Sequence, residues 1–192
     1  MQTRVLILAG GESRRMGQPK GLLNYHGLPQ VQYLYNMVRS LQLEAFISCR
    51  EEQKSLFADL PLITDHAEFS DHGPISGLLS AFHALQGNWL LLGCDYPSLD
   101  KTTITSLLMI EKEAFDVICY KHPDSSIPEP LIAFYTHSTG KKLLDFFNQG
   151  SDSLTGFIKQ SNAFFMADAN AVVLKSADTP EDRDAILSTK HE

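Results

Sequence analysis

This 192-residue sequence lacks the cysteine patterns that hold together small secreted domains and zinc-binding domains. It has three cysteines, Cys49, Cys94 and Cys119, which are widely spaced and form no CxxC pair. A disulfide framework or a zinc site is therefore not expected, because both need more cysteines or closer ones.

Long apolar runs and an excess of positive charge are missing as well. No stretch reaches the roughly 20 apolar residues that span a bilayer. The apolar run at residues 5–9 is too short for the core of a signal peptide. The formal net charge is −7, which disfavours general binding to nucleic acid or to an anionic membrane. We expect a cytoplasmic protein with no nucleic-acid partner and no membrane partner.

The sequence otherwise has the composition of an ordinary globular domain. Hydrophobic residues make up 43% of it and charged residues 20%, and 192 residues suffice to bury a substantial core. No repeat, low-complexity tract or linker interrupts it. We expect a single domain over residues 1–192.

Short apolar runs alternate with helical patterns along the chain. The predicted strands cover residues 4–8, 45–48, 62–64, 89–93, 117–120, 131–135, 163–166 and 172–174. The predicted helices cover residues 30–41, 53–58, 75–85, 102–113, 136–148, 153–159 and 180–187. Strands that alternate with helices predict an α/β fold of three layers, in which helices cover both faces of a mostly parallel central sheet.

A loop rich in glycine and positive charge follows the first predicted strand. From Ala9 to Lys20 its pattern is A-G-G-x-S-x-R-M-G-x-x-K, and neither GxxxxGK[ST] nor GxGxxG is present. Glycines let backbone N–H groups approach phosphate oxygens, and Arg15 and Lys20 supply positive charge. The pattern favours a polyphosphate-binding loop over its alternative, a glycine-rich turn with solvated charges.

Two aspartates follow other predicted strands, where ligands bind in open α/β sheets. Asp95 comes after the most apolar strand, and a carboxylate there is costly to dehydrate without a cation partner. Mg²⁺ that also binds phosphates is one candidate partner; alternatively, Asp95 caps the turn before the helix at 102–113. Asp65 either accepts hydrogen bonds from a ribose or a guanine, or caps a turn.

A segment with the sequence H-G-P-I-S-G, residues 72–77, leads into the helix predicted at 75–85. Its backbone amides could face a sugar or a base. Alternatively, the proline starts the helix and Gly77 allows close packing.

Several reactive side chains are expected to be structural rather than catalytic. None of the seven histidines is assigned as a general base. The side chains expected to be solvated or packed are His26, His66, His72, His137, Cys94 and Trp89.

Together these motifs resemble the nucleotidyltransferase superfamily, which has a Rossmann-like fold, and more narrowly the molybdenum cofactor guanylyltransferase family. The resemblance spans nearly the whole chain. The matching segments are residues 8–20, Asp65, Gly73 to Gly77, Cys94 to Pro97, Glu129 to Tyr135 and Asp178 to Asp182. It implies transfer of GMP from Mg-GTP to the phosphate of molybdopterin, with release of pyrophosphate.

The resemblance also implies roles for individual residues. The implied catalytic residues are Arg15, Lys20 and Asp95. The implied nucleotide-binding residues are Leu8, Ala9, Gly10, Gly11, Lys20, Cys49, Asp65 and Asp95. Asp95 would bind Mg²⁺, the implied cofactor. Residues 1–100 or so would form the nucleotide-binding half and residues 101–192 the acceptor-binding half. GTP and molybdopterin are the implied partners, with molybdoenzyme maturation proteins as further ones.

Two departures from the family pattern concern the base and the acceptor. Cys49 stands where the family often has an asparagine near the base, and Ser176 and Asp178 replace two asparagines near the pterin. One alternative is therefore a related transferase that uses CTP with molybdopterin, or another phosphorylated acceptor. A second alternative is a non-catalytic nucleotide-binding regulator, although the presence of Arg15, Lys20 and Asp95 argues against it.

Overall fold

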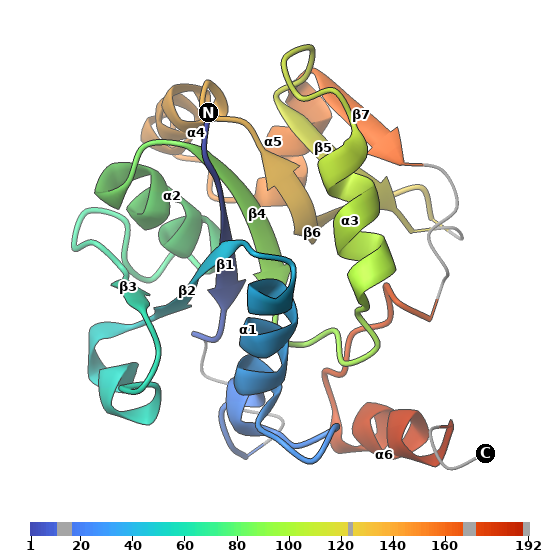
Figure 1. Ribbon diagram of the computed structural model, residues 1–192. Coiled ribbons are helices and arrows are strands. Elements are labelled where there is room, and N and C mark those ends of the chain that lie inside the picture. Colours follow the sequence, from blue (N-terminus) through green and yellow to red (C-terminus); the bar gives the residue numbers. More distant parts are fainter. Residues whose placement is uncertain (11–16, 123–124, 167–171, 190–192) are drawn as a thin grey trace.

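A seven-stranded sheet forms the centre of the protein, and helices cover both of its faces (Figure 1). The computed structural model describes residues 1–10, 17–122, 125–166 and 172–189. The strands are β1 (Thr3–Leu8), β2 (Glu44–Cys49), β3 (Leu62–Thr64), β4 (Asn88–Gly93), β5 (Val117–Lys121), β6 (Pro128–Tyr135) and β7 (Ala163–Met166). Their order in the sheet is β3-β2-β1-β4-β6-β5-β7. Every neighbouring pair is parallel except those of β6, which runs antiparallel to β4 and β5.

The helices divide into two layers according to the hydrophobic cluster that they join. The helices are α1 (Gln30–Ser40), α2 (Pro74–Ala84), α3 (Lys101–Met109), α4 (Thr139–Asn148), α5 (Leu154–Gln160) and α6 (Pro180–Thr189), with 3-10 helices η1 (Lys20–Leu22) and η2 (Glu51–Leu56). One face of the sheet packs against α1 and α3, and the other against α2, α4 and α5. The expected three-layer α/β fold is confirmed.

Alternate residues of the central strands enter opposite layers, because successive side chains of a strand point to opposite faces. Val5 and Ile7 pack on the side of α1, and Leu6 packs on the side of α2. Trp89 is completely buried beside Leu6, so its predicted core position is confirmed. Coverage on both faces explains why β1 and β4 read as continuous apolar runs.

Two predicted elements differ from the structure. The helix predicted at 53–58 is the 3-10 helix η2, which begins and ends two residues earlier. The strand predicted at 172–174 is wrong: these residues form a turn, closed by the Lys175 N–H donating to the Val172 carbonyl at 3.3 Å. Their apolar character comes from burial of Val173 and Leu174 against the core on the α1 side.

The β5–β6 pair is irregular next to the edge where β4 ends. Its register shifts between Cys119 and Lys121, so more residues of β6 than of β5 span the same interval. Because β6 is antiparallel to β4, the beginning of β6 lies at the same edge of the sheet as the end of β4. Residues that precede β6 therefore lie at the same edge of the sheet as those that follow β4.

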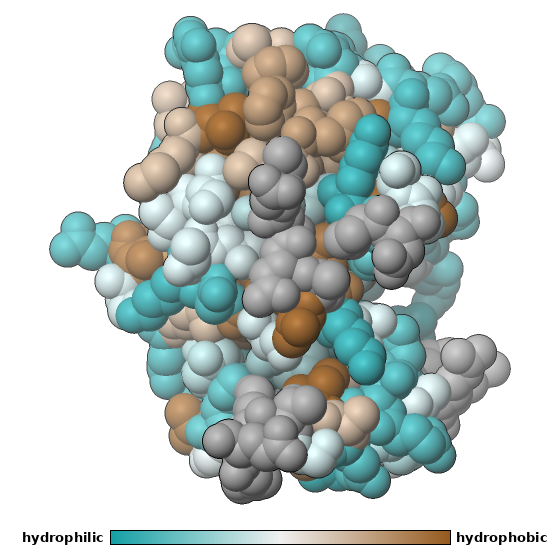
Figure 2. Space-filling model, turned by 90° about the vertical axis from the view of Figure 1, so that its right-hand side faces the viewer, coloured by the Kyte–Doolittle hydropathy of each residue, from teal (hydrophilic) through white to brown (hydrophobic). Residues whose placement is uncertain are grey.

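β7 forms one outer edge of the sheet, and all four of its residues are half-buried. Figure 2 faces this side of the molecule, and apolar atoms gather toward its top, where Figure 1 places β7. Among the residues that the structure describes, no helix is both long and apolar enough to cross a membrane.

Candidate active site

The loops after β1, β2, β3 and β4 meet at one edge of the sheet, since these four strands are mutually parallel. The N–H groups of Ala9 and Gly10 both donate to the Ser48 carbonyl at 3.0 Å. On the other side, the Cys94 N–H donates to the Leu8 carbonyl at 3.2 Å. The end of β1 is thus tied to both of its neighbours, and the segment 8–10 lies in the middle of the edge.

Gly10 packs closely on the end of β2. A Cβ atom at this position would lie 3.4 Å from the Cys49 Cα and 3.5 Å from the Gln53 side-chain oxygen. Gly10 and Cys49, both predicted nucleotide-binding residues, are therefore neighbours. Gly11 and Arg15 lie outside the described residues.

Lys20 lies between two carboxylates at the same edge. Its Nζ is 3.6 Å from Asp95 Oδ2 and also forms an ion pair with Asp178. Burial of the ammonium opposes its charge, but the hydrogen bond that Lys20 donates to Asp178 and the charges of both aspartates outweigh burial and raise the pKa of Lys20. The lysine is therefore held in its cationic form, as binding to phosphate requires.

Asp95 follows β4 directly, and its carboxylate folds back over Gly93. A Cβ atom at position 93 would lie 2.4 Å from Asp95 Oδ1, so only glycine leaves room for this conformation. Oδ1 is buried and has no hydrogen-bond partner among the described residues. Burial raises the pKa of Asp95, and the Lys20 ammonium opposes this shift. The alternative reading of Asp95 as a helix cap is wrong, because Asp100 caps α3 by accepting the Thr103 N–H at 2.8 Å.

An unpartnered carboxylate oxygen fits a Mg²⁺ ligand. Mg²⁺ usually binds one or two protein carboxylates and completes its shell with water and substrate phosphates. Among the described residues there is no cluster of three or more His, Cys, Asp or Glu side chains that could hold a metal alone. Asp95 is thus suited to a metal that a bound nucleotide helps to hold.

Asp65 lies at the end of β3, next to the end of β2. Its N–H donates to the Cys49 carbonyl at 3.2 Å. Burial raises the pKa of its carboxyl to about 6, although the charge of Arg50 opposes the shift. Arg50 also pairs with Asp71 at 3.4 Å, so this part of the edge carries several closely spaced charges.

The start of α2 packs directly on β1 and β2. Gly73, the residue before the helix, has a φ of 71°, which favours glycine, and Pro74 occupies the first turn. A Cβ atom at Gly77 would lie 2.3 Å from Ser48 Oγ and 2.9 Å from Leu8 Cδ2. The close-packing explanation of Gly77 is confirmed.

The side chains that were expected to be structural have structural contacts. His26 Nε2 lies 2.9 Å from the Pro97 carbonyl, and its ring stacks on Tyr33. His72 pairs with Asp152 at 3.4 Å. Burial raises the pKa of the Cys94 thiol far above its usual range, so this residue is not a nucleophile.

Two features of the site were not predicted from the sequence. Asp178 binds Lys20, a contact between residues 158 positions apart that no local pattern could indicate. The backbone tethers this segment as well, because the Ala177 N–H donates to the Asp95 carbonyl at 2.8 Å. The second feature is the buried carboxylate of Glu129, which raises the pKa of Tyr96 together with burial and Asp95. In the sequence, Glu129 stood out only as the first residue of the Glu-Pro-Leu segment that resembles the family.

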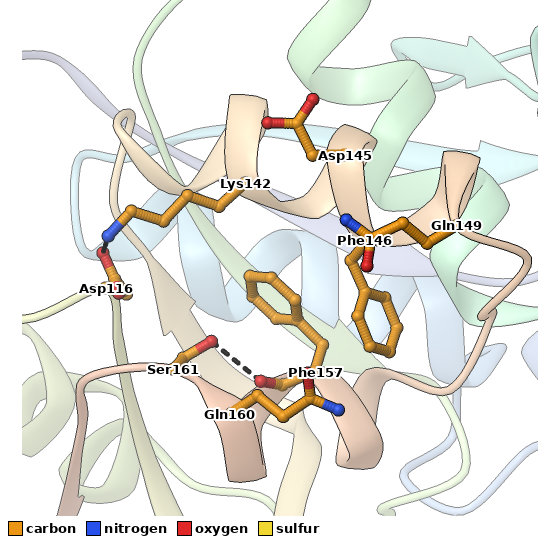
Figure 3. A pocket seen from close by; sticks show the side chains of 8 residues that line it. All are labelled: Asp116, Lys142, Asp145, Phe146, Gln149, Phe157, Gln160 and Ser161. Carbon is orange, nitrogen blue, oxygen red and sulfur yellow. Dashed lines mark hydrogen bonds and ion pairs between the residues drawn. The ribbon is translucent and has the colours of Figure 1, made fainter.

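A cavity of about 300 Å³ lies at the opposite edge of the sheet (Figure 3). It is lined by residues of α4 and α5 and by Asp116, which immediately precedes β5. Lys142 Nζ binds the Asp116 carboxylate at 2.7 Å, and the Asn162 N–H donates to its other oxygen at 3.2 Å. None of the predicted site residues lines this cavity, and Asp116, one of its two aspartates, is already paired.

Comparison with known proteins agrees with this geometry. The family model described as "MobA-like NTP transferase domain" matches residues 5–164. The chain is 37% identical over 134 residues to a molybdenum cofactor biosynthesis bifunctional protein of Synechocystis, covering 68% of this chain and 38% of that protein. It is 29% identical to a probable molybdenum cofactor guanylyltransferase of Trichormus variabilis, covering 92% of this chain and 86% of that protein.

The chain spans less than two thirds of some curated relatives, as the Synechocystis protein and a guanylyltransferase of Pseudomonas entomophila, matched over 58% of its length, illustrate. The crystal structure of molybdopterin-guanine dinucleotide biosynthesis protein A from Archaeoglobus fulgidus has a TM-score of 0.78 at 21% identity, with 98% of each chain covered. That likeness shows a common fold. The family match covers most of the sequence and includes the loop after β1 and Asp95, and the chain therefore belongs to the family of MobA-like NTP transferase domains.

Proposed function

We propose that this protein transfers GMP from Mg-GTP to the phosphate of molybdopterin and releases pyrophosphate. The observation that carries the proposal is the pairing of Lys20 with Asp95, whose buried Oδ1 has no partner among the described residues. The names of the molybdenum cofactor guanylyltransferases among its relatives support the choice of GTP and molybdopterin.

The proposed reaction is a displacement at the α-phosphorus of GTP. An oxygen of the acceptor phosphate forms the new bond, the bond to the β-phosphate oxygen breaks, and pyrophosphate takes away the electron pair. Lys20 would exchange Asp178 for phosphate oxygens and stabilise the charge that develops on the leaving group. Bound Mg²⁺ would supply further positive charge at the phosphates, with Asp95 as its protein ligand.

The remaining predicted residues would hold the nucleoside. Backbone atoms of Leu8, Ala9 and Gly10 lie in the middle of the edge, and Asp65 lies farther along it after β3. The Asp65 carboxylate would accept hydrogen bonds from the ribose or the guanine. The exact alignment of donor and acceptor, rather than a general base, would then provide most of the rate enhancement.

A donor-selectivity assay tests the proposal. Purified protein is supplied with molybdopterin, Mg²⁺ and either GTP, CTP, ATP or UTP, and pyrophosphate release is measured. We expect release with GTP that depends on both molybdopterin and Mg²⁺, and that is lost in Asp95→Asn. A preference for CTP would support the related cytidylyl transfer instead. Nucleotide binding without turnover on any acceptor would support a regulator.

The proposed reaction also implies proteins that receive its product. Molybdoenzyme maturation proteins would take up the product in the cytoplasm. We expect such a protein to co-purify with the tagged chain when the dinucleotide product is being formed. Recovery of the chain alone under product-forming conditions would contradict this part of the proposal.

A further inference from the structure

A buried glutamate and a partly exposed histidine form a pair beside the candidate site, and neither has a part in the proposed phosphate chemistry. Glu129 is near the start of β6, and its side chain is only 4% exposed. Its carboxylate accepts the Leu131 N–H at 2.9 Å and lies 2.8 Å from His122 Nε2. A carboxylate buried this deeply needs such partners, so its position is closely specified.

The strand register places Glu129 next to Asp95. Trp89 pairs with Tyr135 and Leu92 with Ile132 across β4 and β6. Glu129 lies three residues before Ile132, at the edge where β4 ends, and the charge of Glu129 is among the causes that, after burial, raise the pKa of Asp95. The register shift in the β5–β6 pair occurs at this point, and such irregularities redirect side chains beside active sites.

His122 directly follows β5, on the far side of Glu129 from Asp95. Because β6 lies between β4 and β5, the ends of these two strands are about 10 Å apart, twice the usual strand spacing. A group bound at His122 would therefore belong to the part of an acceptor that is remote from its reacting phosphate. The His122 side chain is 36% exposed, so a ligand can reach it.

The carboxylate determines the hydrogen-bonding character of the histidine ring. An ionised carboxylate only accepts hydrogen bonds, so His122 Nε2 carries the hydrogen in this pair. In the neutral ring Nδ1 is then an acceptor. The negative charge of Glu129 beside the ring also favours a ligand group that donates hydrogen bonds over an anionic one.

We infer that His122 binds the acceptor, with Nδ1 accepting a hydrogen bond from an N–H group of the acceptor's heteroaromatic ring, and that Glu129 is the positioning residue that orients His122. The inference rests on the proposed function and adds the residues that recognise the acceptor. Residues at the end of β5 and the start of β6 would then recognise the ring of the acceptor, whereas the loops after β1 to β4 would bind the nucleotide.

The test compares acceptor binding with donor binding in three variants. Molybdopterin and Mg-GTP are titrated separately into the wild-type chain, His122→Ala, Glu129→Gln and the double variant. We expect His122→Ala to weaken molybdopterin binding about tenfold, the usual effect of one hydrogen bond of about 1.4 kcal/mol, while GTP affinity stays within twofold. Glu129→Gln should have a smaller effect in the same direction, with an unchanged melting temperature.

The double variant separates positioning from general support of the fold. If Glu129 acts through His122, the double variant binds molybdopterin no more weakly than His122→Ala. His137→Ala is the matched control, because His137 follows the other end of β6, at the opposite edge of the sheet. It should leave both affinities unchanged.

Three results would overturn the inference. These are unchanged molybdopterin binding in His122→Ala, an equal loss of GTP binding in that variant, and additive effects in the double variant. A wild-type chain that binds GTP but not molybdopterin would overturn the proposed acceptor and this inference with it. The wild-type titration alone identifies that case.

Discussion

Replacing Lys20 with alanine removes the ammonium group that lies 3.6 Å from Asp95 Oδ2 and also pairs with Asp178. We expect kcat/KM for Mg-GTP to fall by about 100-fold or more, because the phosphates of the donor lose a cation positioned for them. The melting temperature should change little by comparison, since the lysine is at the edge of the sheet and outside the core clusters.

The distance and the exposure of Lys20 give the size of this effect. The ammonium lies 3.6 Å from a carboxylate oxygen of Asp95, and a phosphate charge at a similar distance would be attracted by on the order of 4 kcal/mol at an effective dielectric constant of about 20. The Lys20 side chain is 20% exposed, so water screens it only in part. In the free protein Asp178 already forms an ion pair with the ammonium, and this pair must break before phosphate binds. The net loss of transition-state stabilisation is therefore smaller, about 3 kcal/mol, which is close to the effect of removing one preorganised donor.

Pyrophosphate release with molybdopterin and Mg-GTP measures the effect. Lys54→Ala is the matched control, because Lys54 also pairs with a carboxylate, Glu51 at 2.6 Å, but is exposed on η2. Its activity should remain within twofold of the wild type. Near-wild-type turnover of Lys20→Ala, with the fold intact by thermal melting, would refute the assignment of Lys20 to the phosphates.

Two further substitutions test the neighbourhood of the site. A carboxyl whose pKa in the folded protein is raised from 3.8 to about 6 favours folding below pH 4 and loses this contribution as the pH rises through 6. Asp65→Asn should therefore raise the free energy of unfolding in urea by about 1–2 kcal/mol at pH 8 but not at pH 4. The same substitution should weaken GTP binding. Equal changes in stability at both pH values would contradict burial as the cause of the raised pKa. Gly77→Ala would place a methyl group 2.3 Å from Ser48 Oγ and should lower stability by about 1–3 kcal/mol. Gly156→Ala in α5, where the nearest atom is 3.3 Å away, is its control, and equal stability of the two variants would show that α2 is not tightly seated.

The sequence predicted the strands of the sheet and the edge at which several candidate site residues meet, because both depend on local patterns. Short apolar runs marked all seven strands, and polar residues directly after them marked the edge at which Gly10, Asp65 and Asp95 now lie. The loop that contains Lys20 and the turn that contains Asp95 were expected at the same edge for the same reason, since each follows a central strand. Periodicity could not separate the turn at 172–174 from a strand, because burial makes both of them apolar.

The direction of β6 explains why part of the site was missed. Parallel strands need a crossover of a dozen or more residues, and only six residues separate β5 from β6, so the pair is antiparallel. Candidate site residues are expected directly after the parallel strands, whereas Glu129 is near the beginning of an antiparallel one. The contact of Asp178 with Lys20 depends on how the segment around residue 178 returns to the site. No local sequence pattern contains that information.

The reversed strand also bears on how such a domain can change its substrates. The register shift lies in the β5–β6 pair, whereas β1 pairs with β2 and β4, so the shift is outside the pairing of β1. Mutations in this hairpin would therefore accumulate with little penalty to nucleotide binding. In directed evolution, libraries restricted to residues 119–131 should alter acceptor preference while the donor stays the same. Acceptor specificity and donor specificity could then change independently on one fold.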